Sequence, residues 1–251
     1  MRVVDAHHHF WDLDRHYYPW LCDEPLIPFR YGDYSAIRRN YLVPDYLADS
    51  AGFDVVATVH LEGEWDPADP IGETRWLQSV IAEHGYPHAI VAQARLDRED
   101  VEDVLAGQAA LPRVRGVRHK PAAADSPRGV RPGAPGSMDD PRWRAGYALL
   151  ARHRLSFDLQ TPYWHLAEAA RLARDFPETQ IVLNHAGLPA DRSDAGLAAW
   201  RAAMALLAAQ PTGAVKISGL GQPTCPWTVA ANRYVVLETI ALFGVDRCMF
   251  A

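Results

Sequence analysis

The chain has 251 residues, of which 49% are hydrophobic and 22% charged, and its formal net charge is −6. This composition is that of an ordinary globular protein and excludes a disordered chain. The negative charge gives no electrostatic reason to expect nucleic acid or an anionic membrane as a partner, which leaves a small-molecule substrate as the expected ligand. These totals do not indicate an oligomeric state.

Neither export nor membrane insertion is expected. The three cysteines lie far apart and form no Cys-x-x-Cys pair, which favours reduced thiols and a cytoplasmic location. No basic and apolar signal precedes Val3, and the most apolar helix-like stretch, residues 197–209, is interrupted by Arg201.

Three consecutive histidines follow an apolar pair and an acid near the N-terminus, within residues 3–11. Because a β-strand turns successive side chains to opposite faces, His7 and His9 are expected on one face and His8 on the other. Histidine is the commonest nitrogen ligand of divalent metals, so two imidazoles on one face could share an ion or an anionic group. A surface run is the alternative, and the flanking apolar residues favour a strand.

A long segment rich in aromatic residues and proline, residues 17–44, shows little periodicity and predicts a loop over a binding site. Its aromatic side chains could close over a small ligand, or they could only pack the loop down. They are Trp20, Phe29, Tyr31 and Tyr34. Residues 44–52 then predict a short helix that ends at a glycine.

Short β-branched runs alternate from here with alanine- and leucine-rich helical patterns, which indicates repeated βα units and a parallel sheet. The predicted strands after the first are 55–60, 89–96, 116–119, 156–160, 181–185, 215–218 and 247–251. The predicted helices between them are 73–84, 99–110, 142–153, 166–176, 196–210 and 229–243.

Eight strands with intervening helices and no glycine-rich phosphate loop favour a TIM-type (β/α)8 barrel, formed as a single domain of residues 1–251. Such barrels carry their chemistry at the carboxyl ends of the strands. Seven successive predicted strands end in polar residues, so we expect a ring of such groups around a pocket. They are His7, His9, His60, Glu62, Gln93, Arg95, Arg118, His119, Asp158, Gln160, Asn184, His185, Lys216 and Ser218.

Four segments resemble the amidohydrolase superfamily, and more narrowly its branch of sugar lactonases and aromatic-acid lactonases. They are 5–11 (DAHHHFW), 116–119 (GVRH), 183–187 (LNHAG) and 247–251 (RCMFA). The similarity covers essentially the whole chain. It implies a (β/α)8 barrel that hydrolyses lactones or related carbonyl compounds, with the paired histidines falling on His7 and His9 and the downstream histidine on His185.

The pattern departs from the family at its end. The family closes its eighth strand with an aspartate after a Phe-(Ala/Gly)-Ser type sequence, and this sequence stops at Ala251, where that segment should continue. We therefore expect a barrel truncated within strand eight, without its general base or its last helix. A naturally shortened, non-catalytic homologue is the alternative, and the intact polar strand ends disfavour it.

Lactone hydrolysis needs a nucleophilic water, a polarised carbonyl and a proton for the leaving alkoxide. His7, His9 and His185 could hold one zinc-like ion for this purpose. The resemblance equally permits a metal-free version in which the same histidines, with arginines, grip the substrate.

The remaining candidates are substrate-contacting groups. Arg118 suits capture of a carboxylate or an oxyanion, with an outward salt bridge as its alternative. Glu62 shares the face of His60 but could belong to a solvated loop, and Asp158 could bind substrate hydroxyls or serve as a structural cap. The expected substrate-binding set is His119, Asp158, Gln160, Glu62 and Trp20.

Two other functions are compatible with these residues. One is a metal-dependent decarboxylase of aromatic acids in the same superfamily, which uses the same histidines. The other is a ligand-binding barrel that has lost turnover.

Overall fold

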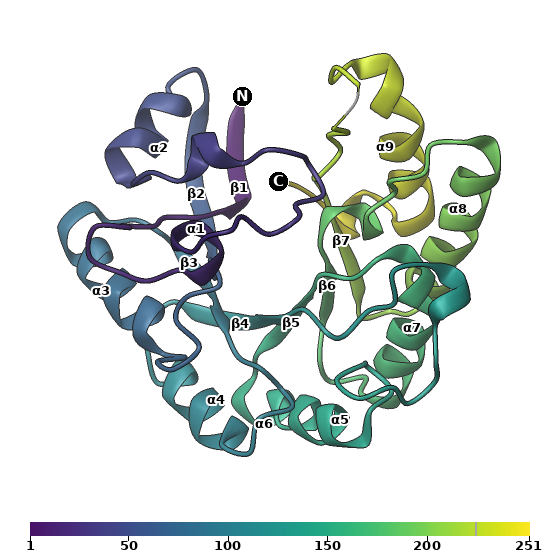
Figure 1. The fold of residues 1–251 in the computed structure, drawn as a ribbon, viewed down its shortest axis with the longest axis horizontal. Helices are drawn as coiled ribbons and strands as arrows, with labels where there is room; N and C mark the ends of the chain where they lie inside the picture. Colours follow the sequence, from purple (N-terminus) through teal and green to yellow (C-terminus); the bar gives the residue numbers. More distant parts are fainter. Residues whose placement is uncertain (224) are drawn as a thin grey trace.

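A computed structural model describes residues 1–223 and 225–251. The described residues form one sheet of eight parallel strands in sequential order. The strands are β1 Arg2–His8, β2 Asp54–Leu61, β3 Ala89–Gln93, β4 Val114–His119, β5 Ser156–Leu159, β6 Ile181–Leu183, β7 Gly213–Ile217 and β8 Cys248–Phe250. Viewed down its axis, the sheet curls into a barrel with the helices outside it (Figure 1).

The helices follow the strands in the order that βα units require. They are α1 Pro19–Cys22, α2 Val43–Asp49, α3 Gly72–His84, α4 Val101–Ala109, α5 Pro141–Ala148, α6 Leu150–His153, α7 Leu166–Asp175, α8 Asp194–Ala208 and α9 Val229–Phe243. Local signals set their ends. Ser193 caps the start of α8 by accepting a hydrogen bond from Gly196 N, and Gly85, at φ 79°, ends α3 in the left-handed region.

The predicted TIM-type barrel is confirmed. Consecutive strands are hydrogen-bonded from β1 through β8, and in the described residues no ladder joins β8 back to β1, so the seam is not sealed. The predicted helix 142–153 is divided at Leu149 into α5 and α6. The predicted loop 17–44 contains α1 and a short 3-10 turn, Ser35–Ile37, because tertiary packing orders a segment that lacks periodicity.

Two apolar clusters hold this arrangement. The larger lies between the strands and the helices, where Trp143, Tyr147 and Trp200 are fully buried. The smaller joins Trp11, Tyr18, Leu21, Tyr34 and Trp65, and it packs the loop after β1 down onto the barrel mouth. None of the helices in the described ranges is long and apolar enough to cross a membrane.

Candidate active site

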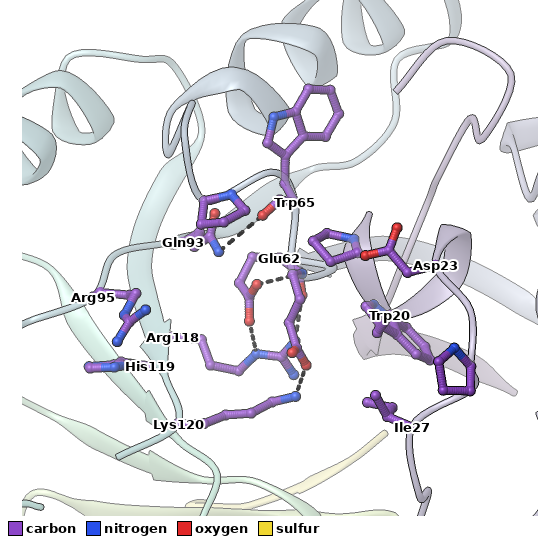
Figure 2. Close-up of a pocket in the computed structure, with 14 residues that line it drawn as sticks. Trp20, Asp23, Ile27, Glu62, Trp65, Gln93, Arg95, Arg118, His119 and Lys120 are labelled. Atoms are coloured by element: carbon purple, nitrogen blue, oxygen red, sulfur yellow. Dashed lines mark hydrogen bonds and ion pairs between the residues drawn. The ribbon is translucent and has the colours of Figure 1, made fainter. Parts of the chain in front are cut away.

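A cavity of about 450 Å³ opens at the carboxyl ends of β2, β3 and β4, beneath the loop that follows β1. Its wall combines aromatic, acidic and basic side chains (Figure 2). The lining residues are Pro19, Trp20, Asp23, Pro25, Ile27, Glu62, Glu64, Trp65, Pro67, Gln93, Arg95, Arg118, His119 and Lys120. A barrel mouth of this size suits a small-molecule ligand.

A buried ion pair between Arg118 of β4 and Glu62, just after β2, lies at the centre of this wall (Figure 2). Arg118 Nε donates to Glu62 Oε1 at 2.5 Å, and both side chains are 4% exposed. Glu62 Oε2 also accepts from Glu64 N at 2.7 Å. The alternatives of an outward Arg118 and a solvated Glu62 are therefore wrong, because strand alternation turns both side chains into the barrel mouth.

The other cations of the wall also have acidic neighbours. Lys120 pairs with Glu64, and Arg95 Nε lies 3.7 Å from Asp97 Oδ1. The wall is therefore largely neutralised by its own side chains, which favours a polar but uncharged ligand over a multiply charged one.

His119 is held in one orientation. Its Nδ1 accepts hydrogen bonds from Leu96 N at 3.1 Å and from Trp143 Nε1 at 3.0 Å. Burial lowers its pKa to about 4, so the ring is neutral at pH 7. With Nδ1 accepting, the proton lies on Nε2, which leaves one donor on this ring.

The backbone after β2 is tied from both sides. Gly63 N donates to Glu73 Oε1 at 2.9 Å, and Trp20 Nε1 donates to Gly63 O at 2.8 Å. Burial raises the pKa of Glu73 well above its ordinary value, and the neighbouring Glu62 adds to the rise. These bonds fix the indole of Trp20 in the cavity wall.

The three predicted histidines come together beside this cavity. The ring centroid of His7 lies 5.1 Å from that of His9 and 4.9 Å from that of His185. His8 points the opposite way, as the alternation predicted, and packs against Tyr46 of α2. The cluster joins the first and sixth strand ends, which are far apart in sequence and adjacent at the barrel mouth.

A strained backbone orients His185. It begins a turn in which three non-glycine residues have positive φ: His185 at 56°, Ala186 at 48° and Leu188 at 56°. Such conformations cost on the order of 1 kcal/mol or more each and persist only where the surroundings impose them. Trp200 Nε1 imposes this one by donating to Ala186 O at 2.8 Å.

Burial lowers the pKa of all three imidazoles, that of His185 to about 3, so they are neutral at pH 7. Arg118 contributes to the lowering at His7 and at His9, which shows that the cluster lies within electrostatic reach of the cavity wall. Neutral imidazoles can bind a metal ion or accept a proton from water.

The histidine cluster has some of the features of a metal site. His9 Nδ1 lies 2.8 Å from Leu61 O and His185 Nδ1 lies 2.9 Å from Ser218 Oγ, which are outer contacts of the kind that orient metal ligands. Within residues 1–223 and 225–251, however, no three His, Cys, Asp or Glu side chains are placed to hold a metal ion. The donor types suit a divalent ion, whereas the ring positions do not complete a ligand set.

Asp158 and Gln160 occupy different surroundings from those of the cavity wall. Asp158 Oδ1 accepts from Lys216 Nζ at 2.6 Å and from Asn184 Nδ2 at 2.8 Å, deep in the barrel. Gln160 Oε1 lies 3.5 Å from Arg118 Nη1. Neither residue lines the cavity, so these contacts fit an internal bracing role at least as well as the predicted substrate contact.

Sequence reasoning did not single out Lys120 or Glu73. Lys120 directly follows the predicted strand 116–119, and its position one residue past a strand end was the available signal. Glu73 lies at the start of α3, where an acid is ordinary, and only its burial distinguishes it.

The family model described as Amidohydrolase matches residues 4–251. Together with the barrel and the histidine cluster at its mouth, this match shows that the chain belongs to the amidohydrolase family.

Three similar proteins sharpen this placement. An uncharacterized protein of Sinorhizobium fredii is 44% identical over 99% of this chain and 83% of its own length. An L-fucono-1,5-lactonase of Burkholderia ambifaria is 29% identical over 90% of this chain and 69% of its own. A crystal structure of an amidohydrolase from Burkholderia multivorans with bound Zn has a TM-score of 0.77 at 25% identity, covering 100% of this chain and 84% of that one.

Proposed function

We propose that this protein hydrolyses a small lactone at the mouth of the barrel. The observation that carries the proposal is the cluster of neutral imidazoles of His7, His9 and His185 beside a cavity walled by Arg118 and Glu62. The L-fucono-1,5-lactonase among its relatives supports the same reaction. Of the two lactone classes, sugar-acid lactones suit this cavity better, since its cations already have acidic partners.

In the proposed reaction, one C–O bond forms and one C–O bond breaks. The oxygen of water bonds to the carbonyl carbon, the ring C–O bond breaks, and the leaving alkoxide takes a proton while the ring opens to a hydroxy acid. A neutral imidazole of the cluster accepts the proton of the attacking water, because an uncharged ring has a free lone pair, and it returns this proton to the leaving alkoxide. Arg118, held by Glu62, is a fixed positive charge near the carbonyl.

His119, Gln160, Asp158, Glu62 and Trp20 are the proposed substrate-binding groups. Trp20 offers an apolar face to a sugar ring, and His119 Nε2 offers a single donor to a hydroxyl. Asp158 would act indirectly, through Lys216 and Asn184, which it holds by hydrogen bonds inside the barrel.

We also propose that His7, His9 and His185 bind one divalent ion, in a ring arrangement that differs from the one described above. The outer contacts of His9 and His185 and the Zn-bound relative support this proposal. When bound, a zinc-like ion would supply a Lewis acid that polarises the carbonyl. Elemental analysis of the purified protein, before and after dialysis against chelator, tests this assignment.

The test of the function is an assay with a panel of lactones, L-fucono-1,5-lactone among them, in which released acid is followed with a pH indicator. The protein is expressed from its gene to the natural stop codon. Acid release that is lost in His185→Asn supports the proposal. Carbon dioxide from benzoate-type acids would instead indicate a decarboxylase, and saturable binding without turnover would indicate a binding barrel.

A further inference from the structure

The loop between β1 and α2 reaches across the barrel mouth to the segment that follows β7 (Figure 1). Its tip contacts that segment at two glycines. A Cβ on Gly32 would lie 3.8 Å from Pro223 Cβ, and a Cβ on Gly221 would lie 3.9 Å from Tyr31 Cδ1. The loop therefore places its own side chains over the part of the barrel mouth that contains His7, His9 and His185.

The hydroxyl of Tyr31 lies beside His185. A Cβ built on Gly219 would be 2.5 Å from Tyr31 Oη and 2.7 Å from His185 Cβ, so the phenol and the imidazole flank the same point. Tyr31 Oη is buried and has no hydrogen-bond partner in the described part of the chain. Leaving a buried hydroxyl unpaired is destabilising, and an acceptor on a bound ligand would remove that cost.

Arg30 brings a positive charge to the same place. Its guanidinium lies 5.3 Å from the ring centroid of Tyr31, and after burial it is the largest cause of the lowered pKa of His185. No ion pair joins Arg30 to an acid within residues 1–223 and 225–251, in contrast to the paired arginines of the cavity wall. Its charge is therefore available to a ligand.

We propose that Tyr31 Oη and the Arg30 guanidinium are hydrogen-bond donors to the carbonyl oxygen of the substrate, delivered by the loop onto the histidine cluster. The inference rests on the proposed lactone hydrolysis. The carbonyl oxygen is neutral in the lactone and becomes negative when water adds, so both donors bind the transition state more strongly than the substrate. The phenol keeps its proton throughout, and no bond forms to either side chain.

The same loop supplies a matched control. Arg39 lies over the ring of Tyr41 at 5.6 Å, in the same kind of stack as Arg30 on Tyr31. Here, however, both members have acidic partners, because Arg39 pairs with Asp45 and the Tyr41 hydroxyl donates to Asp49. The variants Arg39→Gln and Tyr41→Phe therefore remove the same groups from a pair that already has acidic partners.

The experiment measures kcat and KM for the most active lactone of the panel. We expect Tyr31→Phe and Arg30→Gln each to lower kcat about 100-fold, as removal of one oxyanion donor does, with KM little changed. Arg30→Lys should recover part of the loss, and Arg39→Gln and Tyr41→Phe should behave as wild type. Wild-type kcat in Tyr31→Phe and Arg30→Gln overturns the inference and leaves the hydrolase intact.

A binding measurement separates this inference from the function on which it rests. Calorimetric titration with gluconate, whose carboxylate offers the same kind of acceptor, is expected to lose at least about tenfold in affinity in Arg30→Gln. A wild type that opens no lactone yet binds gluconate through Arg30 overturns the hydrolase and retains the donor pair. Gluconate binding equal in wild type and Arg30→Gln, without turnover, overturns both.

Discussion

The two halves of the barrel mouth use their polar groups in opposite ways. Over β2, β3 and β4 the charges are paired within the protein, as Arg118 with Glu62 and Lys120 with Glu64. Over β1, β6 and β7 the imidazoles are neutral, the backbone of His185 is strained, and Tyr31 Oη and the buried Nδ1 of His7 have no partner in the described residues. The charges of the first half are paired without a ligand, whereas the second half leaves a phenol and an imidazole nitrogen unpaired beside the histidine cluster.

This difference suggests that the paired half recognises the substrate and that the histidine half carries out the reaction. A paired wall presents a fixed pattern of shape and dipoles, and it gains little from a further charge. Unpaired nitrogen and oxygen atoms are costly in an empty site and are recovered only when something binds or reacts there. The histidine half is therefore where substitutions should act mainly on turnover. In the paired half, apart from Arg118, they should act mainly on stability and affinity.

The largest effect is expected from His7→Asn in the histidine half. Removing an imidazole that serves in proton transfer typically costs 10²- to 10⁴-fold in rate, so we expect kcat for lactone opening to fall about 10³-fold. The unfolding midpoint in urea should stay near that of wild type, because the lost ring nitrogen has no partner within the described chain. Steady-state kinetics and urea titration measure the two quantities.

The control for this variant is His84→Asn at the end of α3, a histidine that lies outside the cavity wall. Full activity in His84→Asn and the predicted loss in His7→Asn would locate the chemistry in the cluster. If both variants keep wild-type kcat, the histidine half has no part in the reaction and the comparison fails.

We expect Glu62→Gln in the paired half to lower the free energy of unfolding, by an amount comparable to the loss of transition-state stabilisation in His7→Asn. The change leaves Arg118, 4% exposed, without its carboxylate. Breaking a buried pair on one side typically costs about 3–5 kcal/mol, because the remaining charge is uncompensated. Urea unfolding should show this loss in Glu62→Gln.

The double variant Glu62→Gln/Arg118→Met removes the stranded charge and should regain part of the stability. A double variant no more stable than Glu62→Gln would mean that the loss comes from elsewhere, such as the bond from Glu64 N to Glu62 Oε2 at 2.7 Å.

The sequence predicted the barrel because period-two and helical patterns alternate with little ambiguity, and it predicted the meeting of His7, His9 and His185 because strand ends of a barrel converge. It could not predict that Glu62 pairs with Arg118. That pairing depends on which face of each strand turns inward, which the long-range register decides: Arg118 stands opposite Gln93 on one side and Asp158 on the other.

The sequence also could not predict the role of the loop between β1 and α2. Tyr31 was one of four aromatic residues with two equally supported interpretations, and Arg30 carried no pattern at all. The position of Tyr31 depends on contacts with Gly219 and Gly221, nearly 190 residues away along the chain, for which no local signal exists.

The smallest expected effect is the contribution of His119 in the paired half to the pH dependence of stability. Burial lowers the pKa of His119 to about 4 from an ordinary value of 6.5. Above pH 6.5 the ring is neutral in both the folded and the unfolded chain, so it contributes nothing to the pH dependence. Between pH 6.5 and about 4 the unfolded chain takes up a proton that the folded chain refuses, so the unfolding free energy falls as the pH falls.

The slope of this loss is about 1.4 kcal/mol per pH unit for one such group. His119→Asn removes the titrating ring while its amide oxygen replaces Nδ1 as acceptor for Leu96 N and Trp143 Nε1. We therefore expect urea unfolding at pH 7 and pH 5 to differ less in His119→Asn than in wild type, with near-wild-type stability at pH 7. If the difference in stability between pH 7 and pH 5 were the same in both proteins, His119 would be protonated in the folded protein at pH 5. The paired half would then contain a positive charge without an acidic partner.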